Sequence, residues 1–461
     1  MKSVYVILKD KEKDMYYDVR PEIFYLLSIR NRKLVNLDSK SDGRILEQEV
    51  EKAFNKLPIL EGGNIYAIYV YNSSVMDVMR ELSNRFKDQY PQIQQLPTYF
   101  KNFKDGDIFI RHNYSAPMVD LRRSMIRIKA LEKGADDNQL DRYFVQTWVT
   151  LCLFFDTYSY GFLADKIFVG ESDIEKRVCR FCGKSGRNRF KELSHAVQEG
   201  LGNKLLFCNE ECDECNHYFE KAVERHLYKF LEIPRTLTNV SGKKSRNHHL
   251  EGLNFHIHPD PTTLKPVIYV KQEFIYNDIY KGKPTGRIHL YNKGSISFHG
   301  IYKALVKIAI DLMPDAKMCH FVKAGQWVHG DFEGKNLPIF LYGEHNEFFS
   351  QPVLDLFFKN GRSPKFSPYC TAILYIFDSI FIYTIPFNDI DGDRFINSSS
   401  LQRHWIFFKQ YQYLTSEEWE EIDSNDTKEQ LPFYKIPVIP LDDKYDIQFR
   451  PSKDEIFKTT Q

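Results

Sequence analysis

Residues 179–230 read CRFCGKSGRNRFKELSHAVQEGLGNKLLFCNEECDECNHYFEKAVERHLYKF. Two Cys-x-x-C pairs lie in this stretch, Cys179/Cys182 near its start and Cys212/Cys215 in its second half. Paired Cys-x-x-C turns are typical of a structural zinc ion held by thiolates. Because a short segment buries little apolar surface, a metal that clamps the two turns together substitutes for part of a core. The sequence therefore predicts a zinc-stabilised module here.

The other cysteines and the chain's apolar runs favour a soluble, cytoplasmic protein. The chain has 8 cysteines in 461 residues, and those outside the two pairs are scattered, which favours metal over disulfides and a reducing compartment. Cys208 lies near the second pair and could replace one ligand, but the regular pair is the preferred donor set. The N-terminus reaches charged residues too soon for a secretory signal, and the most apolar run, 144–155, is too short to span a bilayer.

The segment between the cysteine pairs predicts a β-hairpin followed by a helix. Residues 190–195 have a strand pattern, and 205–208 provide the returning strand. A helical pattern covers 219–230, in a helix that begins at the second pair. This order puts His195 on the hairpin and Asn216 near the start of the helix, where the two side chains could face each other across a groove.

The order Cys-x-x-C, His195, Asn203, Cys-x-x-C-Asn resembles the bacterial zinc-knuckle subgroup of the HNH endonucleases. The segments SHAVQEGLGN and ECDECN carry the resemblance, which covers about residues 177–230. It implies a ββα-metal fold, a structural zinc on the four cysteines and hydrolysis of DNA phosphodiester bonds. It also implies a role in bacterial defence against foreign DNA.

The resemblance also implies roles for individual residues. His195 matches the histidine that acts as general base, a task that suits an imidazole whose pKa lies near the operating pH. Asn203 matches the asparagine that steadies the loop and orients the base. Asn216 occupies the place of the final histidine, a ligand of a catalytic divalent ion such as Mg²⁺, which neutralises charge on the scissile phosphate.

One position departs from the HNH pattern. Ser194 stands where many members of the family have an aspartate or histidine that provides a second metal ligand. Glu192, on the same strand face as Ser194, and Glu224, about two helical turns beyond Asn216, are the candidates to complete the site.

Basic residues around the first cysteine pair predict a face for nucleic acid. The whole chain has 63 Lys and Arg against 62 Asp and Glu, so its net charge exerts no general attraction for nucleic acid. Local clusters suit contacts to backbone phosphates, which position DNA with weak sequence preference. The predicted contacts are Arg180, Lys184, Arg187, Arg189 and Lys191, with a second cluster of Lys243, Lys244 and Arg246.

The predicted fold class is a multidomain α+β protein with the zinc-bound ββα module at its centre. We expect an N-terminal α/β domain (1–116), a helical connector (117–170), the module itself (171–235) and a C-terminal α+β domain (236–461). In the first domain, 73–86 predicts a helix capped by Ser73 or Ser74. In the last, 372–385 predicts a strand hairpin that turns near Asp378 and Ser379, and 405–408 predicts a strand.

Two alternatives to an active nuclease stay open at this point. The first is a non-catalytic, zinc-dependent protein that binds nucleic acid, in which His195 only contacts phosphate. The second is a nuclease that stays silent until a flanking domain binds a regulatory ligand or partner protein. The sequence leaves open the choice between DNA and RNA, the oligomeric state and the roles of the flanking domains.

Overall fold

The computed structural model describes a mixed α+β protein with several small sheets. The described residues are 6–9, 14–17, 22–27, 32–37, 43–62, 66–112, 124, 128, 150–162, 166–238, 249–259, 266–270, 275–280, 283–334, 336–392, 394, 398–409 and 419–440. The chain divides into two compact units, Met1–Cys152 with Phe162–Asp165, and Leu153–Gly161 with Lys166–Gln461. The predicted helical connector (117–170) lies outside the described residues from 117 to 149, apart from 124 and 128, and its described end contains the short helix α6 (Thr150–Phe154) and two strands, β8 (Phe155–Tyr160) and β9 (Ile167–Val169).

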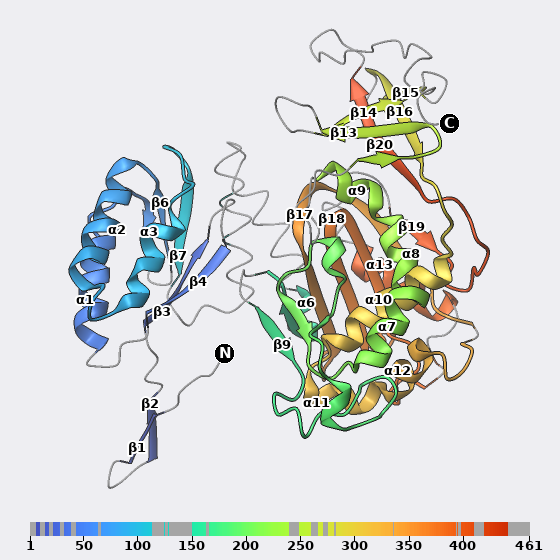
Figure 1. Ribbon diagram of the computed structural model, residues 1–461, viewed down its shortest axis with the longest axis horizontal. Coiled ribbons are helices and arrows are strands. Elements are labelled where there is room, and N and C mark those ends of the chain that lie inside the picture. The colour runs from blue at the N-terminus through green and yellow to red at the C-terminus, as the bar shows by residue number, and fades with distance from the viewer. Residues whose placement is uncertain are drawn as a thin grey trace. The chain divides into compact units, whose positions relative to one another are not determined.

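The first unit contains an antiparallel sheet of order β4-β3-β7-β6-β5, and helices cover one face of it (Figure 1). Aromatic side chains fill the interface, and Phe54, Phe100 and Phe109 are fully buried there. A separate two-stranded sheet pairs β1 with β2. The elements are β1 (Val6–Lys9), β2 (Asp14–Tyr17), β3 (Glu22–Leu27), β4 (Arg32–Leu37), α1 (Gly43–Phe54), β5 (Ile59–Gly62), β6 (Tyr66–Val70), α2 (Ser73–Phe86), α3 (Gln95–Tyr99) and β7 (Ile108–His112).

The cap of α2 differs from the prediction. Asn72, and neither Ser73 nor Ser74, is the N-cap, and its side-chain oxygen accepts a hydrogen bond from the Val75 N–H at 3.3 Å. Asparagine is as favourable as serine at the N-cap position, and α2 begins at the residue after Asn72.

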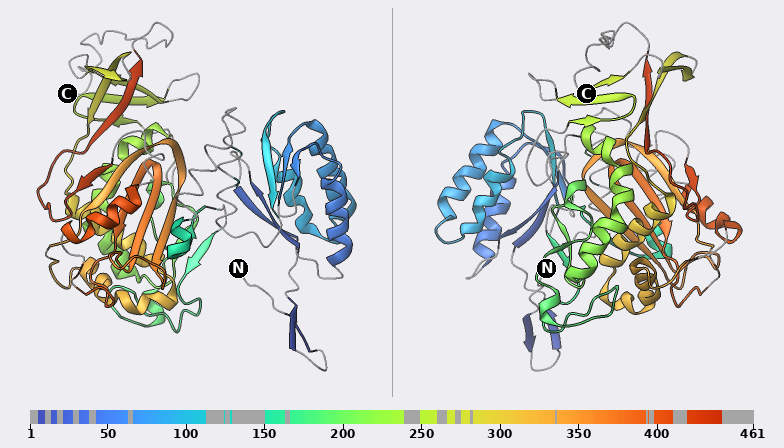
Figure 2. Two further views of the ribbon diagram at one scale, coloured as in Figure 1. Left: turned by 180° about the vertical axis from the view of Figure 1, so that it is seen from behind. Right: turned by 45° about the vertical axis from the view of Figure 1, so that its right-hand side comes forward.

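The second unit is built on a sheet of two long strands, β17 (Phe340–Lys359) and β18 (Cys370–Thr384), with β8 (Phe155–Tyr160) and β19 (Glu420–Ile422) paired to β17. Helix α10 (Phe298–Asp311) covers one face of this sheet and α13 (Ser398–Lys409) covers the other (Figures 1 and 2). Helices α11 (Asp315–Met318) and α12 (Val322–His329) follow α10 in the chain, and α6 (Thr150–Phe154) precedes β8.

Alternate side chains of β17 explain why both faces are covered. Leu356 and Phe358 lie in the same core as the apolar residues of α10, whereas Phe357 contacts Phe408 of α13 with ring centroids 5.7 Å apart. Successive side chains of a strand point to opposite faces, so apolar residues at consecutive positions need a cover on each side.

Helix α10 is the centre of the main core. Ser297 is its N-cap and accepts a hydrogen bond from the Gly300 N–H at 3.1 Å. Its buried residues run around the whole helix, which is the pattern of a helix enclosed by other elements. A Cβ atom at Gly300 would lie 2.2 Å from the ring of His226, so glycine allows the close approach of the neighbouring helix α8 (Glu224–Phe230).

The segment that carries the two cysteine pairs forms a three-stranded sheet and a run of helices that pack into this core. The sheet order is β10-β11-β9, and β11 pairs with β9 in parallel, whereas the other described strand pairs are antiparallel. The elements are β9 (Ile167–Val169), β10 (Ser194–His195), β11 (Leu206–Cys208), α7 (Asp213–Ala222), α8 and α9 (Glu232–Leu237).

Two further small sheets complete the second unit, of order β12-β13-β14 and β15-β16-β20. Their strands are β12 (Leu250–Glu251), β13 (Phe255–Pro259), β14 (Pro266–Val270), β15 (Ile275–Tyr280), β16 (Lys283–Tyr291) and β20 (Phe433–Pro440).

Two predictions for the second unit are wrong. Residues 372–384 lie in the single strand β18, and the predicted turn is a β-bulge, where Phe377 has a φ of 54° and the register to β17 shifts. Residues 405–408 belong to helix α13, in which Leu401, Trp405 and Phe408 are buried. Their spacing of four and three residues is helical and outweighs the short aromatic run.

Candidate functional site

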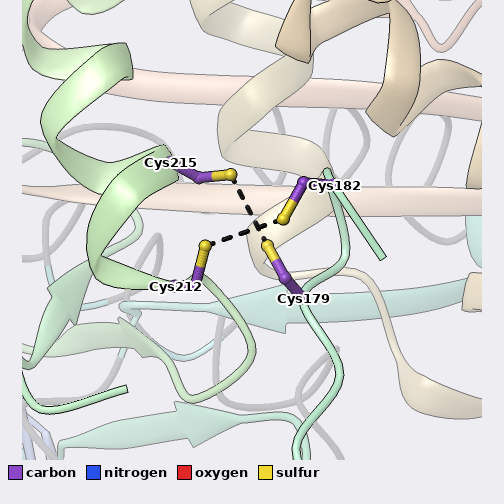
Figure 3. A group of neighbouring side chains, drawn as sticks. All are labelled: Cys179, Cys182, Cys212 and Cys215. Carbon is purple, nitrogen blue, oxygen red and sulfur yellow. Dashed lines mark hydrogen bonds between the residues drawn. The ribbon is translucent and has the colours of Figure 1, made fainter. Parts of the chain in front are cut away.

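The four paired cysteines come together in one cluster (Figure 3). Their sulfur atoms lie within 4.8 Å of one another, and the pairs Cys179–Cys215 and Cys182–Cys212 are each 3.7 Å apart. Four thiolates at about 2.3 Å from a central zinc would be about 3.8 Å from one another, which is the edge of that tetrahedron. The cluster therefore fits a structural zinc ion in number, chemistry and spacing.

Local backbone structure positions each pair. The first pair lies in a tight turn, where the Gly183 N–H donates to the Cys179 carbonyl oxygen at 3.0 Å. The second pair lies at the start of α7, with Cys212 as its N-cap residue. Cys208, the alternative ligand, is buried in β11 outside the cluster.

Electrostatics also favour a cation among the thiols. Hydrogen bonds from Cys179 and Cys215 lower the pKa of Cys212. The hydrogen bond to Cys212 is the main reason that the pKa of Cys179 rises to about 12. Without a cation, one thiolate is thus stabilised by neighbours that stay protonated. A divalent zinc ion would allow all four to ionise.

Asn203 ties together the loop between the two strands of the hairpin. Its amide nitrogen donates to the carbonyl oxygens of Val197 and Leu206 at 2.7 and 2.8 Å, and its amide oxygen accepts from the N–H groups of Leu205 and Leu206 at 3.1 and 2.8 Å. The side chain is fully buried. A buried amide with this many partners fixes the path of the backbone after His195.

His195 lies at the end of β10, opposite Phe207 of β11. Its half-buried ring contacts the Phe207 ring, with centroids 4.7 Å apart. The preceding residue, Ser194, points to the other face and is buried, where its hydroxyl donates to Glu211 at 2.6 Å. The serine that stands at the family's second metal-ligand position therefore lies within a buried hydrogen-bond network.

The start of α7 is fastened to the strand that carries His195. The carboxylate of Asp213 accepts hydrogen bonds from the N–H groups of Lys191 and Glu192, at 3.2 and 3.0 Å. Asn216, on the same helix, is half-buried, and its N–H donates to the Cys212 carbonyl oxygen at 2.9 Å. Hairpin and helix thus form one unit with the four-cysteine cluster at its base.

The two tentative metal ligands have different surroundings. Glu192 is exposed, and its carboxylate lies 3.2 Å from Nε2 of His217, the residue that follows Asn216. This contact places an oxygen donor beside the helix position next to Asn216. Glu224 instead is buried and forms an ion pair with Lys307 at 2.9 Å. That ion pair occupies Glu224, so it is not an open ligand for a catalytic ion.

Lys307 of α10 is the centre of a buried polar cluster that sequence reasoning missed. Its ammonium lies 3.0, 2.9 and 2.8 Å from the carboxylates of Glu211, Glu224 and Asp311, and donates to the His195 carbonyl oxygen at 3.3 Å. Burial alone would lower the pKa of Lys307, but the carboxylates raise it well above its ordinary value. Burial raises the pKa of Glu211 to about 8. The carboxylates around Lys307 therefore keep its ammonium charged in this buried position.

The predicted phosphate contacts fall into four groups. Arg180 does not fit the prediction, because its side chain is only 2% exposed and is paired with Glu210 and Asp315 while donating to main-chain oxygens at the end of α10. Arg187 pairs with Glu175, and Lys184 and Arg189 pair with Glu214, all on the surface. Lys191 is exposed. Lys243, Lys244 and Arg246 lie outside the described residues.

Comparisons with known proteins add no relative. No protein-family model matches the chain, and neither the curated proteins nor the solved structures give a match. Among the helices of the described residues, none is long and apolar enough to cross a membrane.

Proposed function

We propose that this protein is a metal-dependent HNH-type endonuclease that hydrolyses DNA phosphodiester bonds. The observation that carries the proposal is the combination of His195 at the end of β10, Asn203 cross-linking the following loop and the tetrahedral cysteine cluster at the start of α7. The segment resembles the family in the order of its residues, and its β10–β11–α7 arrangement has the ββα connectivity that the resemblance implies.

In the proposed reaction, His195 takes the proton from the water that attacks the phosphorus atom. A half-buried imidazole at a strand end is exposed enough to meet the water and fixed enough to orient it. Phe207 supports the ring from one side, Asn203 holds the loop that follows, and Lys307 holds the His195 carbonyl oxygen. These contacts keep the general base in one position.

A catalytic divalent ion would use oxygen donors on both sides of the hairpin–helix junction. Asn216 and Glu192 offer an amide oxygen and a carboxylate, the ligand types that hard cations such as Mg²⁺ prefer. Glu192 lies beside α7 through its contact with His217, the residue that follows Asn216, and the two proposed ligands fit such an ion in kind. When bound, the ion would neutralise charge on the scissile phosphate and on the leaving oxygen.

The test is cleavage of plasmid and single-stranded DNA by the wild-type protein, His195→Ala and His320→Ala, first in EDTA and then with Mg²⁺, Mn²⁺ or Ni²⁺. His320 is also half-buried and lies away from the hairpin, beside Tyr369, so it is the matched control. Each protein is first shown to be folded and to hold zinc. We expect metal-dependent cleavage by the wild type and the control, and a loss of at least about 100-fold in His195→Ala.

Other outcomes separate the alternatives. Cleavage that survives in the folded His195→Ala protein removes this histidine from the mechanism. Salt-sensitive binding without cleavage in any divalent ion indicates a non-catalytic binding protein or a nuclease that awaits a ligand or partner of its flanking regions.

A further inference from the structure

A row of rings crosses the three-stranded sheet that carries His195. In the strand register, His195 of β10 lies opposite Phe207 of β11, and Phe207 lies beside Phe168 of β9. The Phe207 and Phe168 rings are stacked, with centroids 5.0 Å apart and planes inclined by 15°. Residues in register on neighbouring strands point to the same face. The imidazole and both phenyl rings therefore lie on one face of this sheet.

The two faces of the sheet differ in their surroundings. The adjacent positions Val169, Cys208 and Ser194 point to the opposite face and are buried in the second unit. On the ring-bearing face, Phe207 is only 3% exposed, whereas Phe168 is 49% exposed. Phe168 thus rests one side of its ring on Phe207 and presents much of its apolar surface to solvent.

A single exposed phenylalanine is common on protein surfaces, but Phe168 has basic neighbours. Lys166 is exposed, and its ammonium lies 5.7 Å from the centre of the Phe207 ring. Lys204 is exposed just before β11. β9 and β11 run in parallel, and β10 runs antiparallel to them. The first residues of β9 and β11 and the last residue of β10 therefore lie at the same end of the sheet. His195, Lys166 and Lys204 therefore gather at the same end of the sheet.

We propose that Phe168 is a stacking platform for an unpaired base of a DNA strand whose phosphate backbone lies between Lys166, Lys204 and His195. This proposal rests on the proposed nuclease function and specifies its substrate as single-stranded or locally unpaired DNA. Proteins that bind single strands combine a basic groove with exposed aromatic rings, on which bases of any sequence stack. In a duplex the faces of the bases are hidden within the stack, so a platform favours bases that have left it.

The spacing suits one strand. Neighbouring β-strands are about 4.8 Å apart, so β9 and β10, on either side of β11, are separated by about 10 Å. Stacked nucleotides rise by about 3.4 Å along one strand, so the base on Phe168 would lie about three nucleotides from the phosphate at His195. Phe168 would hold the DNA strand a few nucleotides from the reacting bond and would not contact that bond.

The test measures binding and needs no cleavage. Fluorescence anisotropy gives the dissociation constant of a labelled single-stranded oligonucleotide and of its duplex, with no divalent ion added. The proteins are the wild type, Phe168→Ala, Phe168→Trp and Val322→Ala. Val322 lies on α12 with the same exposed fraction as Phe168, 49%, and is the control for loss of an exposed apolar side chain.

We expect Phe168→Ala to weaken single-strand binding by about 5- to 150-fold, the range for loss of one base–aromatic contact. Phe168→Trp and Val322→Ala should bind like the wild type, and duplex binding should change little. A single abasic position, moved along the oligonucleotide, should reproduce the loss at one site in the wild type and add nothing in Phe168→Ala.

The remaining outcomes overturn the proposal in distinguishable ways. If the folded Phe168→Ala protein binds single strands as tightly as Val322→Ala does, or loses single-strand and duplex binding equally, the platform is wrong and the nuclease proposal stands on its own test. If the wild type binds neither oligonucleotide, the platform fails together with the proposed function.

Discussion

The ammonium of Lys307 donates to the main-chain oxygen of His195, 3.3 Å away and 112 residues earlier in the chain. The same ammonium neutralises carboxylates from the loop before α7, from α8 and from its own helix. One side chain of α10 thus connects the strand of the candidate base with the helices behind it.

Replacing Lys307 by Met should cost about 3–5 kcal/mol of unfolding free energy, because Glu211, Glu224 and Asp311 would lose the buried cation with which each forms an ion pair. Lys303→Met, one turn earlier on α10, is the control and should cost about 1 kcal/mol or less, since Lys303 is half-buried above the Trp327 ring. Urea unfolding measures both. Equal losses in the two variants would remove the special role of Lys307.

Cys212→Ser should lose the zinc ion and much of the stability of the second unit. Structural zinc contributes directly to folding in small metal-stabilised modules. Cys208→Ala removes a buried thiol from β11, outside the cluster, and should keep its zinc. Metal analysis of the purified proteins gives the zinc content of each. Zinc loss in Cys208→Ala with retention in Cys212→Ser would mean that the donor set is different.

Arg180 and Arg187 should separate folding from DNA binding. Arg180→Ala removes a buried guanidinium that pairs with Glu210 and donates to the Met313 carbonyl oxygen at 2.7 Å, and it should destabilise the protein by about 2–4 kcal/mol. Arg187→Ala breaks an exposed pair with Glu175 and should change stability by less than about 1 kcal/mol.

For DNA binding we expect the larger effect in Arg187→Ala and the smaller effect in Arg180→Ala. Arg187→Ala should reduce the slope of log affinity against log salt by about one. Arg180→Ala, measured at a temperature where it is folded, should leave that slope unchanged. If the slope of log affinity against log salt falls in Arg180→Ala alone, Arg180 contacts phosphate after all.

His404 should make the second unit sensitive to acid. Burial lowers the pKa of His404 to about 3, and its Nε2 lies 2.9 Å from the Thr371 hydroxyl. Below pH 6.5 His404 takes up a proton in the unfolded chain but stays neutral in the folded chain, so acid favours unfolding. The contribution of His404 to the free energy of unfolding is therefore fully present above pH 6.5 and is lost as the pH falls toward 3. Between pH 7 and pH 4.5 the loss amounts to about 2–3 kcal/mol.

The matched variant for this prediction is His404→Gln, which keeps a polar group beside Thr371 and does not titrate. Its unfolding free energy should fall less than that of the wild type over the same pH range in urea titrations. Parallel pH profiles would show that the histidine is not the origin of the acid sensitivity.

Local patterns predicted the four-cysteine cluster and the hairpin because their signals are contained within one segment, although only Ser194–His195 of the predicted strand 190–195 is a strand. The spacing of Cys179, Cys182, Cys212 and Cys215 indicated which four thiols come together, whereas the loop role of Asn203 was implied by the resemblance to the HNH family. Lys307 and Arg180 could not be placed in this way. A lysine inside an apolar helix and an arginine inside a basic run acquire buried partners only when distant segments pack together.

The errors in the second unit have a similar origin. Asp378 and Ser379 have the composition of a turn, but the buried strand continues through a bulge there, and the Asp378 carboxylate accepts a hydrogen bond from the Tyr434 hydroxyl. That partner, 56 residues away, satisfies a polar group which local reasoning assigned to solvent. In α13 the spacing of Leu401, Trp405 and Phe408 is helical, whereas the short aromatic run 405–408 taken alone is typical of a strand.

Gly325 on α12 allows this helix to press against the backbone of the first cysteine turn, since a Cβ atom there would lie 2.4 Å from the Arg180 carbonyl oxygen. A fragment limited to residues 171–235 would lack α12, Lys307 and the end of α10, whose main-chain oxygens accept hydrogen bonds from Arg180. The cysteine module therefore depends on its contacts with α10 and α12. To transplant it into another protein, an engineer would have to carry α10 and α12 with it.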